Sequence, residues 1–114
     1  NAGLLAELLS TDENANRIGE VAFVPASSPI NRSGVLFFNT LFDENAACHI
    51  AFGAGHPTNI QGCSAMTRAQ LMEKGLNDSA IHEDVMIGAP DTHITGTTKD
   101  GQEVTIFVNG EWAF

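Results

Sequence analysis

The residues best placed for chemistry are His82 and Asp84, one residue apart in the segment "AIHEDVMIG". If this segment is a strand, both side chains project from the same face of the sheet. An imidazole nitrogen and a carboxylate oxygen both suit zinc, cobalt or manganese, so the pair could act as a two-ligand unit. A hydrogen-bonded couple without a metal explains the same spacing equally well.

Two further residues, His49 and Glu20, lie in strand-like segments. In "ACHIAFG", alternation puts His49 on a face with two alanines, which leave room around its imidazole ring. In "GEVAFVP", Glu20 shares a face with apolar residues, where a carboxylate is costly unless it is paired or bound to a cation. Taken singly, a structural histidine and a strand-end charge are the simpler interpretations.

Most of the other polar candidates are better explained by structural roles. His56 follows a glycine-rich loop and could serve either purpose. Asp43 and Glu44 are better explained as solvated or helix-capping acids than as a carboxylate site. His93 is expected at the surface of a hairpin.

The helices and strands that position these residues are expected to form an α+β fold. It should have a mixed, mostly antiparallel sheet and a few short helices. Periodicity and breakers predict helices over 4–9 and 67–74, strands over 20–25, 47–53 and 80–88, a turn over 27–34, and two hairpin strands plus a short last strand over 93–114. The apolar segment 35–47 fits a strand or a helix, because periodicity alone does not choose between them.

Composition limits the classes of function. A chain of 114 residues with 43% hydrophobic content can close one core. Its formal charge of -9 repels nucleic acid and anionic membranes and suits cations. No apolar run approaches the ~20 residues of a membrane span, so we expect a soluble, cytoplasmic protein. Cys48 and Cys63 are expected to be reduced thiols, without a disulfide.

Three segments in order, "GEVAFVP", "SPINRSGVLFFNTLFDENAACHIAFG" and "IHEDVMIG", resemble the C-terminal part of a metallo-aminopeptidase family. This family is typified by the bacterial aminopeptidases T, S and PepS, the thermophilic metallo-aminopeptidase or leucyl aminopeptidase II type. The resemblance runs from about Ile18 to the C-terminus. It implies that residues 3–114 are a C-terminal catalytic, metal-binding portion of such an enzyme, and residues 1–2 read as an expression-tag remnant.

The resemblance also implies a ligand set. The family holds two divalent ions, zinc or cobalt with manganese or magnesium as further options, on two glutamates, two histidines, an aspartate and a tyrosine. Matched by motif, Glu20, His49, His82 and Asp84 fall on ligand positions, and His56 stands where the family has its tyrosine. The other family glutamate lies upstream of the "GE" motif and has no counterpart in the 19 residues before Glu20. We expect His49 to matter more than His56, because His56 lies in a loop.

The function implied by the resemblance is metal-dependent hydrolysis of N-terminal residues from peptides. Glu20 would then be both a ligand and the group that shuttles a proton. The expected partners are peptides with a free N-terminus and a second copy in a homodimer, and we expect the chain to be inactive by itself. The alternative is a non-catalytic dimerisation or assembly domain with a relic metal site.

Overall fold

The computed structural model describes residues 2–114, which form two compact units. Unit 1 contains the residues up to Val21 together with Ile50–Val85, and unit 2 contains Ala22–His49 and Met86–Phe114. Composition predicted one core, whereas the contacts within the chain divide it in two. The chain passes between the units three times, each time at or beside the end of a strand.

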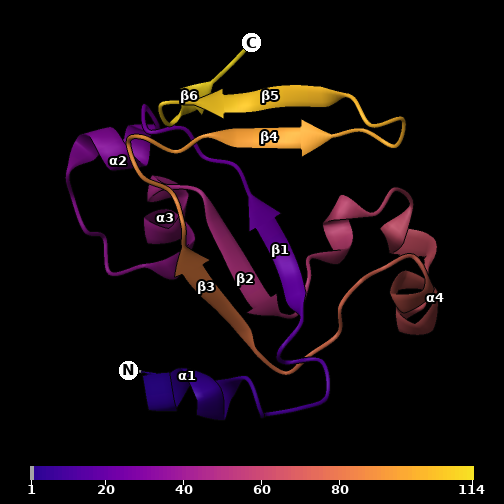
Figure 1. Ribbon diagram of the computed structural model, residues 1–114. Helices are drawn as coiled ribbons and strands as arrows, with labels where there is room; N and C mark the ends of the chain where they lie inside the picture. The colour runs from indigo at the N-terminus through magenta and orange to yellow at the C-terminus, as the bar shows by residue number, and fades with distance from the viewer. Residues whose placement is uncertain (1) are drawn as a thin grey trace. The chain divides into compact units, whose positions relative to one another are not determined.

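One three-stranded sheet, most of whose residues belong to unit 1, carries Glu20, His49, His82 and Asp84. It has three strands in the order β1 (Ile18–Ala22), β2 (His49–Gly53) and β3 (His82–Met86). Neighbouring arrows run in opposite directions (Figure 1), and the hydrogen bonds that flank the strands agree with this. Three central segments were therefore predicted correctly as strands, and the antiparallel expectation is confirmed.

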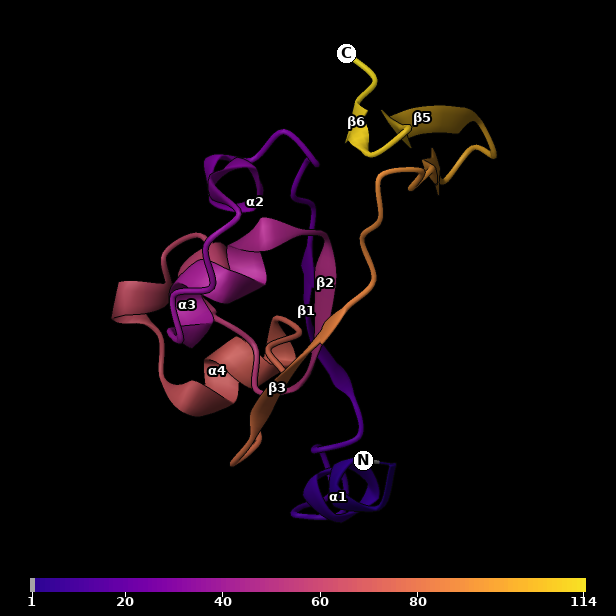
Figure 2. The same ribbon diagram turned by 90° about the vertical axis from the view of Figure 1, so that its left-hand side faces the viewer.

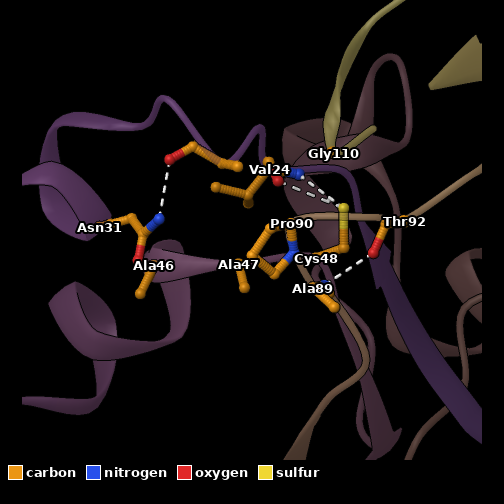
Figure 3. A pocket seen from close by; sticks show the side chains of 11 residues that line it. Val24, Asn31, Ala46, Ala47, Cys48, Ala89, Pro90, Thr92 and Gly110 are labelled. Atoms are coloured by element: carbon orange, nitrogen blue, oxygen red, sulfur yellow. Dashed lines mark hydrogen bonds between the residues drawn. The ribbon is translucent and has the colours of Figure 1, made fainter. Parts of the chain in front are cut away.

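The strand expected to reach Pro25 ends earlier, at Ala22. Beyond Ala22 the backbone bonds to a thiol and not to a neighbouring strand. The Val24 N–H donates to Cys48 Sγ, and the Cys48 thiol donates to the Val24 carbonyl, both at 3.3 Å (Figure 3). Because the thiol takes both backbone groups of Val24, β1 does not continue through this residue. Cys48 and Cys63 are both free thiols, as expected.

Short polar contacts hold the loops of unit 1 in place. The carboxylate of Asp12 accepts hydrogen bonds from the Ala80 N–H at 2.7 Å and from the Ser79 hydroxyl at 2.8 Å. These bonds, led by that from Ala80, hold the pKa of Asp12 below its ordinary value. The side-chain amide of Asn77 donates to the carbonyls of Asn14 and Gly53. The segment before β3 is thus tied to both earlier parts of the unit.

Two helices in unit 1 agree with the sequence. Helix α1 spans Ala2–Leu8, and α4 spans Arg68–Glu73. Helix α4 begins where expected because Thr67 and Gln70 form a capping box, in which each side chain bonds to the backbone of the other. Two short 3-10 helices, η2 (Pro57–Asn59) and η3 (Cys63–Ala65), lie between β2 and α4.

The sheet of unit 2 is formed by β4 (Ile94–Thr97), β5 (Glu103–Val108) and β6 (Glu111–Trp112), in that order and antiparallel. Strands β5 and β6 lie side by side in both views (Figures 1 and 2). Phe107 is fully buried, with ring centroids 4.5 Å from Trp112 and 6.2 Å from Phe23. The "KDGQ" and "NG" turns predicted from sequence are where the strands connect.

The segment predicted as a turn over 27–34 is instead a short helix, α2 (Pro29–Ser33). Ser28 caps it by accepting from the Asn31 N–H, Pro29 occupies its first turn, and Gly34 ends it with a φ of 63°. Each of these residues also fits a turn, but together they are a helix start and stop. The undecided segment 35–47 contains α3 (Thr40–Asp43) and the 3-10 helix η1 (Glu44–Ala46). No helix within residues 2–114 is long and apolar enough to cross a membrane.

Candidate metal centre

Three side chains of unit 1 converge on one point: Glu20 from the middle of β1, His82 from the start of β3, and His56 from the loop after β2. One ligand atom of each lies within 4.8 Å of the other two. Glu20 Oε2 is 3.0 Å from His56 Nε2 and 3.9 Å from His82 Nε2. We call these residues the three-residue centre. Its donors, one carboxylate oxygen and two imidazole nitrogens, are the types that zinc binds.

The ring of His82 is oriented by the backbone. Its Nδ1 lies 2.7 Å from the carbonyl oxygen of Ala54. Because a carbonyl only accepts, Nδ1 is the donor in this contact, and the tautomer that fits it has its lone pair on Nε2. Ala54 is itself fixed, since its N–H donates to the Ile81 carbonyl at 2.7 Å. This arrangement is the one that usually holds a metal-binding histidine.

Asp84 adjoins the three-residue centre, as the strand spacing predicted. Its Oδ1 lies 3.5 Å from His82 Nε2, and its side chain is only 12% exposed. Within residues 2–114 this oxygen has no hydrogen-bond partner. A buried carboxylate oxygen without a hydrogen bond is costly, and a nearby cation would offset that cost. The local structure therefore fits a bound divalent ion.

His56 reaches Glu20 from an exposed loop. It precedes Pro57, the first residue of η2, and its side chain is 56% exposed. Its ring centroid is 5.0 Å from that of His82. Sequence reasoning gave His56 less weight than His49, because a loop residue is less preorganised than a strand residue and the family has a tyrosine at this position. The one indication was its position seven residues after His49.

The structure does not bring His49 into this three-residue centre. His49 belongs to unit 2, where it is the first residue of β2, and it is 1% exposed. Its Nδ1 lies 3.0 Å from the Ala47 carbonyl, so the same proton argument leaves the lone pair on Nε2. A role for His49 as a ligand stays a prediction.

The remaining polar candidates have structural surroundings. Asp43 accepts hydrogen bonds from the N–H groups of Phe37 and Asn39, at 2.9 and 3.0 Å, and so orders the start of α3. Glu44 is the residue that ends α3. His93 is exposed, as expected. Unit 2 also has a cavity of about 110 Å³, which is lined mainly by small residues and the Cys48 thiol (Figure 3).

Comparisons with known proteins place these residues in context. A family model, Thermophilic metalloprotease (M29), matches residues 1–112. "Aminopeptidase 2" of Geobacillus stearothermophilus is 52% identical over 110 residues, which are 96% of this chain and 27% of that protein. "Aminopeptidase T" of Thermus thermophilus is 44% identical over 109 residues, which are 96% of this chain and 26% of that protein.

A solved structure agrees with these sequence matches. "Wild-type AmpT from Thermus thermophilus" superposes with a TM-score of 0.82 at 44% identity, covering 98% of this chain and 27% of that one. The expected α+β fold is confirmed by this likeness. The chain spans about a quarter of the length of the relatives it matches.

Proposed function

This chain belongs to the thermophilic metalloprotease (M29) family, and we propose that it supplies divalent-metal ligands to a metallo-aminopeptidase. The relatives named above are aminopeptidases, but the chain covers only 26–27% of their length. The complete activity is therefore part of the proposal. The observation that supports it best is the convergence of Glu20, His56 and His82 within 4.8 Å.

We assign the three-residue centre to the metal, with Asp84 beside it. His49 remains a further proposed ligand, from the resemblance to the family. The proposal includes two divalent ions, zinc or cobalt, with manganese or magnesium as further options, because nitrogen and carboxylate donors suit several metals. Such ions supply Lewis acidity, which makes water a better nucleophile and polarises a peptide carbonyl.

The residues of this chain would contribute orientation and proton transfer. The bond from His82 Nδ1 to the Ala54 carbonyl fixes the direction of Nε2 before anything binds. The Glu20 side chain is 19% exposed, and its Oε2 lies within 4 Å of both imidazoles. A carboxylate in that position can take a proton from water and give it to the departing amine. We propose this second role for Glu20.

The proposed substrates are peptides with a free N-terminus. A homodimer and inactivity of this chain by itself also stay predictions. The competing proposal is a dimerisation or assembly domain in which the centre no longer binds metal. It differs in one measurable property, because its histidines would have no affinity for a divalent ion beyond that of any surface histidine.

Metal analysis of the purified chain separates these two proposals. After equilibration with zinc and removal of the excess, we expect the unaltered chain to retain zinc near stoichiometric amounts. His82→Ala should lower zinc affinity by at least about tenfold, since even the loss of groups behind the ligands has that effect. His93→Ala, an exposed histidine outside the centre, is the matched control and should bind like the unaltered chain. Retention below about a tenth of an equivalent would support the relic domain.

A further inference from the structure

A second cavity, of about 150 Å³, adjoins the three-residue centre within unit 1. His56 belongs to both, and Gly19, which precedes Glu20, also lines the cavity. Two apolar residues, Ile60 and Leu76, form part of the wall. The remaining lining side chains that matter here are Asn59, Lys74 and Asn77. We call this cavity the lysine pocket.

The charge of the lysine pocket is opposite to that of the chain. The chain has 14 acidic and 5 basic residues, yet this lining includes Lys74 and no aspartate or glutamate. Within residues 2–114 the ammonium of Lys74 has no ion pair, whereas Arg68 is paired with Asp78. A cation at the wall of an otherwise acid-free cavity favours an anionic group.

The side-chain amides in the lining also favour an anionic group. The side-chain amide of Asn77 is already used, since it donates to the carbonyls of Asn14 and Gly53. The side-chain amide of Asn59 makes no hydrogen bond to the other described residues, 2–114. Asn59 and Lys74 therefore offer donors, and an ionised carboxylate is an acceptor with two oxygens.

The pocket is open to solvent, and its volume is comparable to that of a small ligand group. A β-carbon added at Gly55 would lie 3.0 Å from the Gly19 carbonyl oxygen and 3.2 Å from Leu76 Cδ1, so this part of the wall is closely packed. An engineered cavity of about 150 Å³ accepts benzene, which has six heavy atoms. One glycine residue with its carboxylate, or the end of an acidic side chain, is of similar size.

We infer that the lysine pocket is a subsite for a carboxylate of the peptide substrate, held by Lys74 and Asn59. The inference rests on the proposed function, because His56 would join the pocket to the metal centre. The carboxylate could be the C-terminus of a short peptide or an acidic side chain following the N-terminal residue. The two sources share one chemistry and are separated by experiment.

The test is an NMR titration of the isotope-labelled, zinc-equilibrated chain, which follows the amide signals of Lys74 and Gly75. Leucyl-glycine is compared with leucyl-glycinamide, which lacks the terminal carboxylate. Leucyl-glutamic acid α-amide is compared with leucyl-glutamine α-amide, which lacks the side-chain carboxylate. We expect the carboxylate member of one pair to bind about two- to fivefold more tightly, the range of a solvent-accessible ion pair. The responding pair identifies the source.

Three variants assign the preference to Lys74. Lys74→Met should reduce it to about one, and Lys74→Arg should keep most of it, because the positive charge remains. Lys99→Met removes the same charge from the turn between β4 and β5 and should leave the preference unchanged. Dispersed spectra of each variant establish that it folds.

The inference is overturned if neither carboxylate peptide binds better than its amide, if none binds measurably, or if Lys74→Met keeps the preference. Zinc retention is measured on the same samples. A chain that binds zinc without a carboxylate preference refutes the subsite alone, whereas a chain that binds no zinc refutes the proposed function.

Discussion

His82 and His56 approach the same carboxylate from surroundings of different rigidity. His82 lies on a strand, is 27% exposed and has a hydrogen bond from Nδ1 to a backbone carbonyl. His56 lies on a loop and is 56% exposed, and among residues 2–114 its ring nitrogens contact only Glu20, at 3.0 Å. Because a preorganised ligand loses less freedom on binding, His82 should contribute more to metal affinity than His56.

Replacing His56 tests this difference. We expect His56→Ala to weaken zinc binding less than His82→Ala does, and His56→Tyr to keep the metal, since a phenol oxygen can also bind zinc and restores the residue type of the family. Calorimetric zinc titrations of the chain and the three variants measure this order. Equal, large losses for His56→Ala and His82→Ala would show that the loop is as well organised as the strand.

At the residue scale, the alternation of side-chain directions predicted which residues share a face, but only within strands. It put His82 and Asp84 on one face, and His82 Nε2 lies 3.5 Å from Asp84 Oδ1. It could not place His56, because the direction of a loop side chain depends on contacts such as that of the Gly55 N–H with the Asn77 carbonyl. Those contacts join segments more than twenty residues apart, so local sequence does not reveal them.

At the scale of elements, the close approach of β1 to the end of β2 depends on Gly19. A β-carbon there would lie 2.2 Å from the Gly53 carbonyl oxygen and 2.5 Å from that of Ala54. Both are backbone atoms, so neither can rotate away. The next residue, Glu20, takes its position from this contact, and the Ala54 carbonyl orients His82.

We predict that Gly19→Ala lowers the free energy of unfolding by about 1–3 kcal/mol, the usual cost of overpacking. It should also weaken zinc binding, because β1 must move away from β2. Gly96→Ala is the control: the nearest atom to its β-carbon would be the end of the Ile106 side chain, at 3.1 Å, and the nearest backbone oxygen would be at an ordinary 3.8 Å. Urea unfolding and zinc titration of both variants measure the effects. A Gly19→Ala chain as stable as the unaltered one would contradict this account of the sheet.

Sequence patterns predicted the presence of helices and strands better than the residues at which they begin and end. Helix α4 was predictable because its capping box consists of neighbouring residues. Helix α2 was missed because serine, proline and glycine are as common in turns as at helix ends. The strand thought to reach Pro25 is shorter because Val24 bonds to Cys48, a residue 24 positions away.

At the scale of the whole molecule, the three-residue centre lies entirely in unit 1, and its residues come from segments on both sides of Ala22–His49, the first segment of unit 2. Composition suggested a single core, since hydrophobic content counts residues without locating them. The resemblance to the family carried most of the functional information, because each motif alone had an equally good structural explanation. The relatives extend well beyond this chain, which covers 27% of AmpT.

The most direct test of the central claim is anomalous diffraction at the zinc edge, from crystals of the chain grown with zinc. We predict a peak bonded to Glu20 Oε2, His56 Nε2 and His82 Nε2, at about 2.0–2.2 Å from each. Crystals of His82→Ala grown in the same way should lose or weaken that peak. A well-ordered three-residue centre without an anomalous peak, or zinc bound only at other residues such as His93, would contradict the assignment.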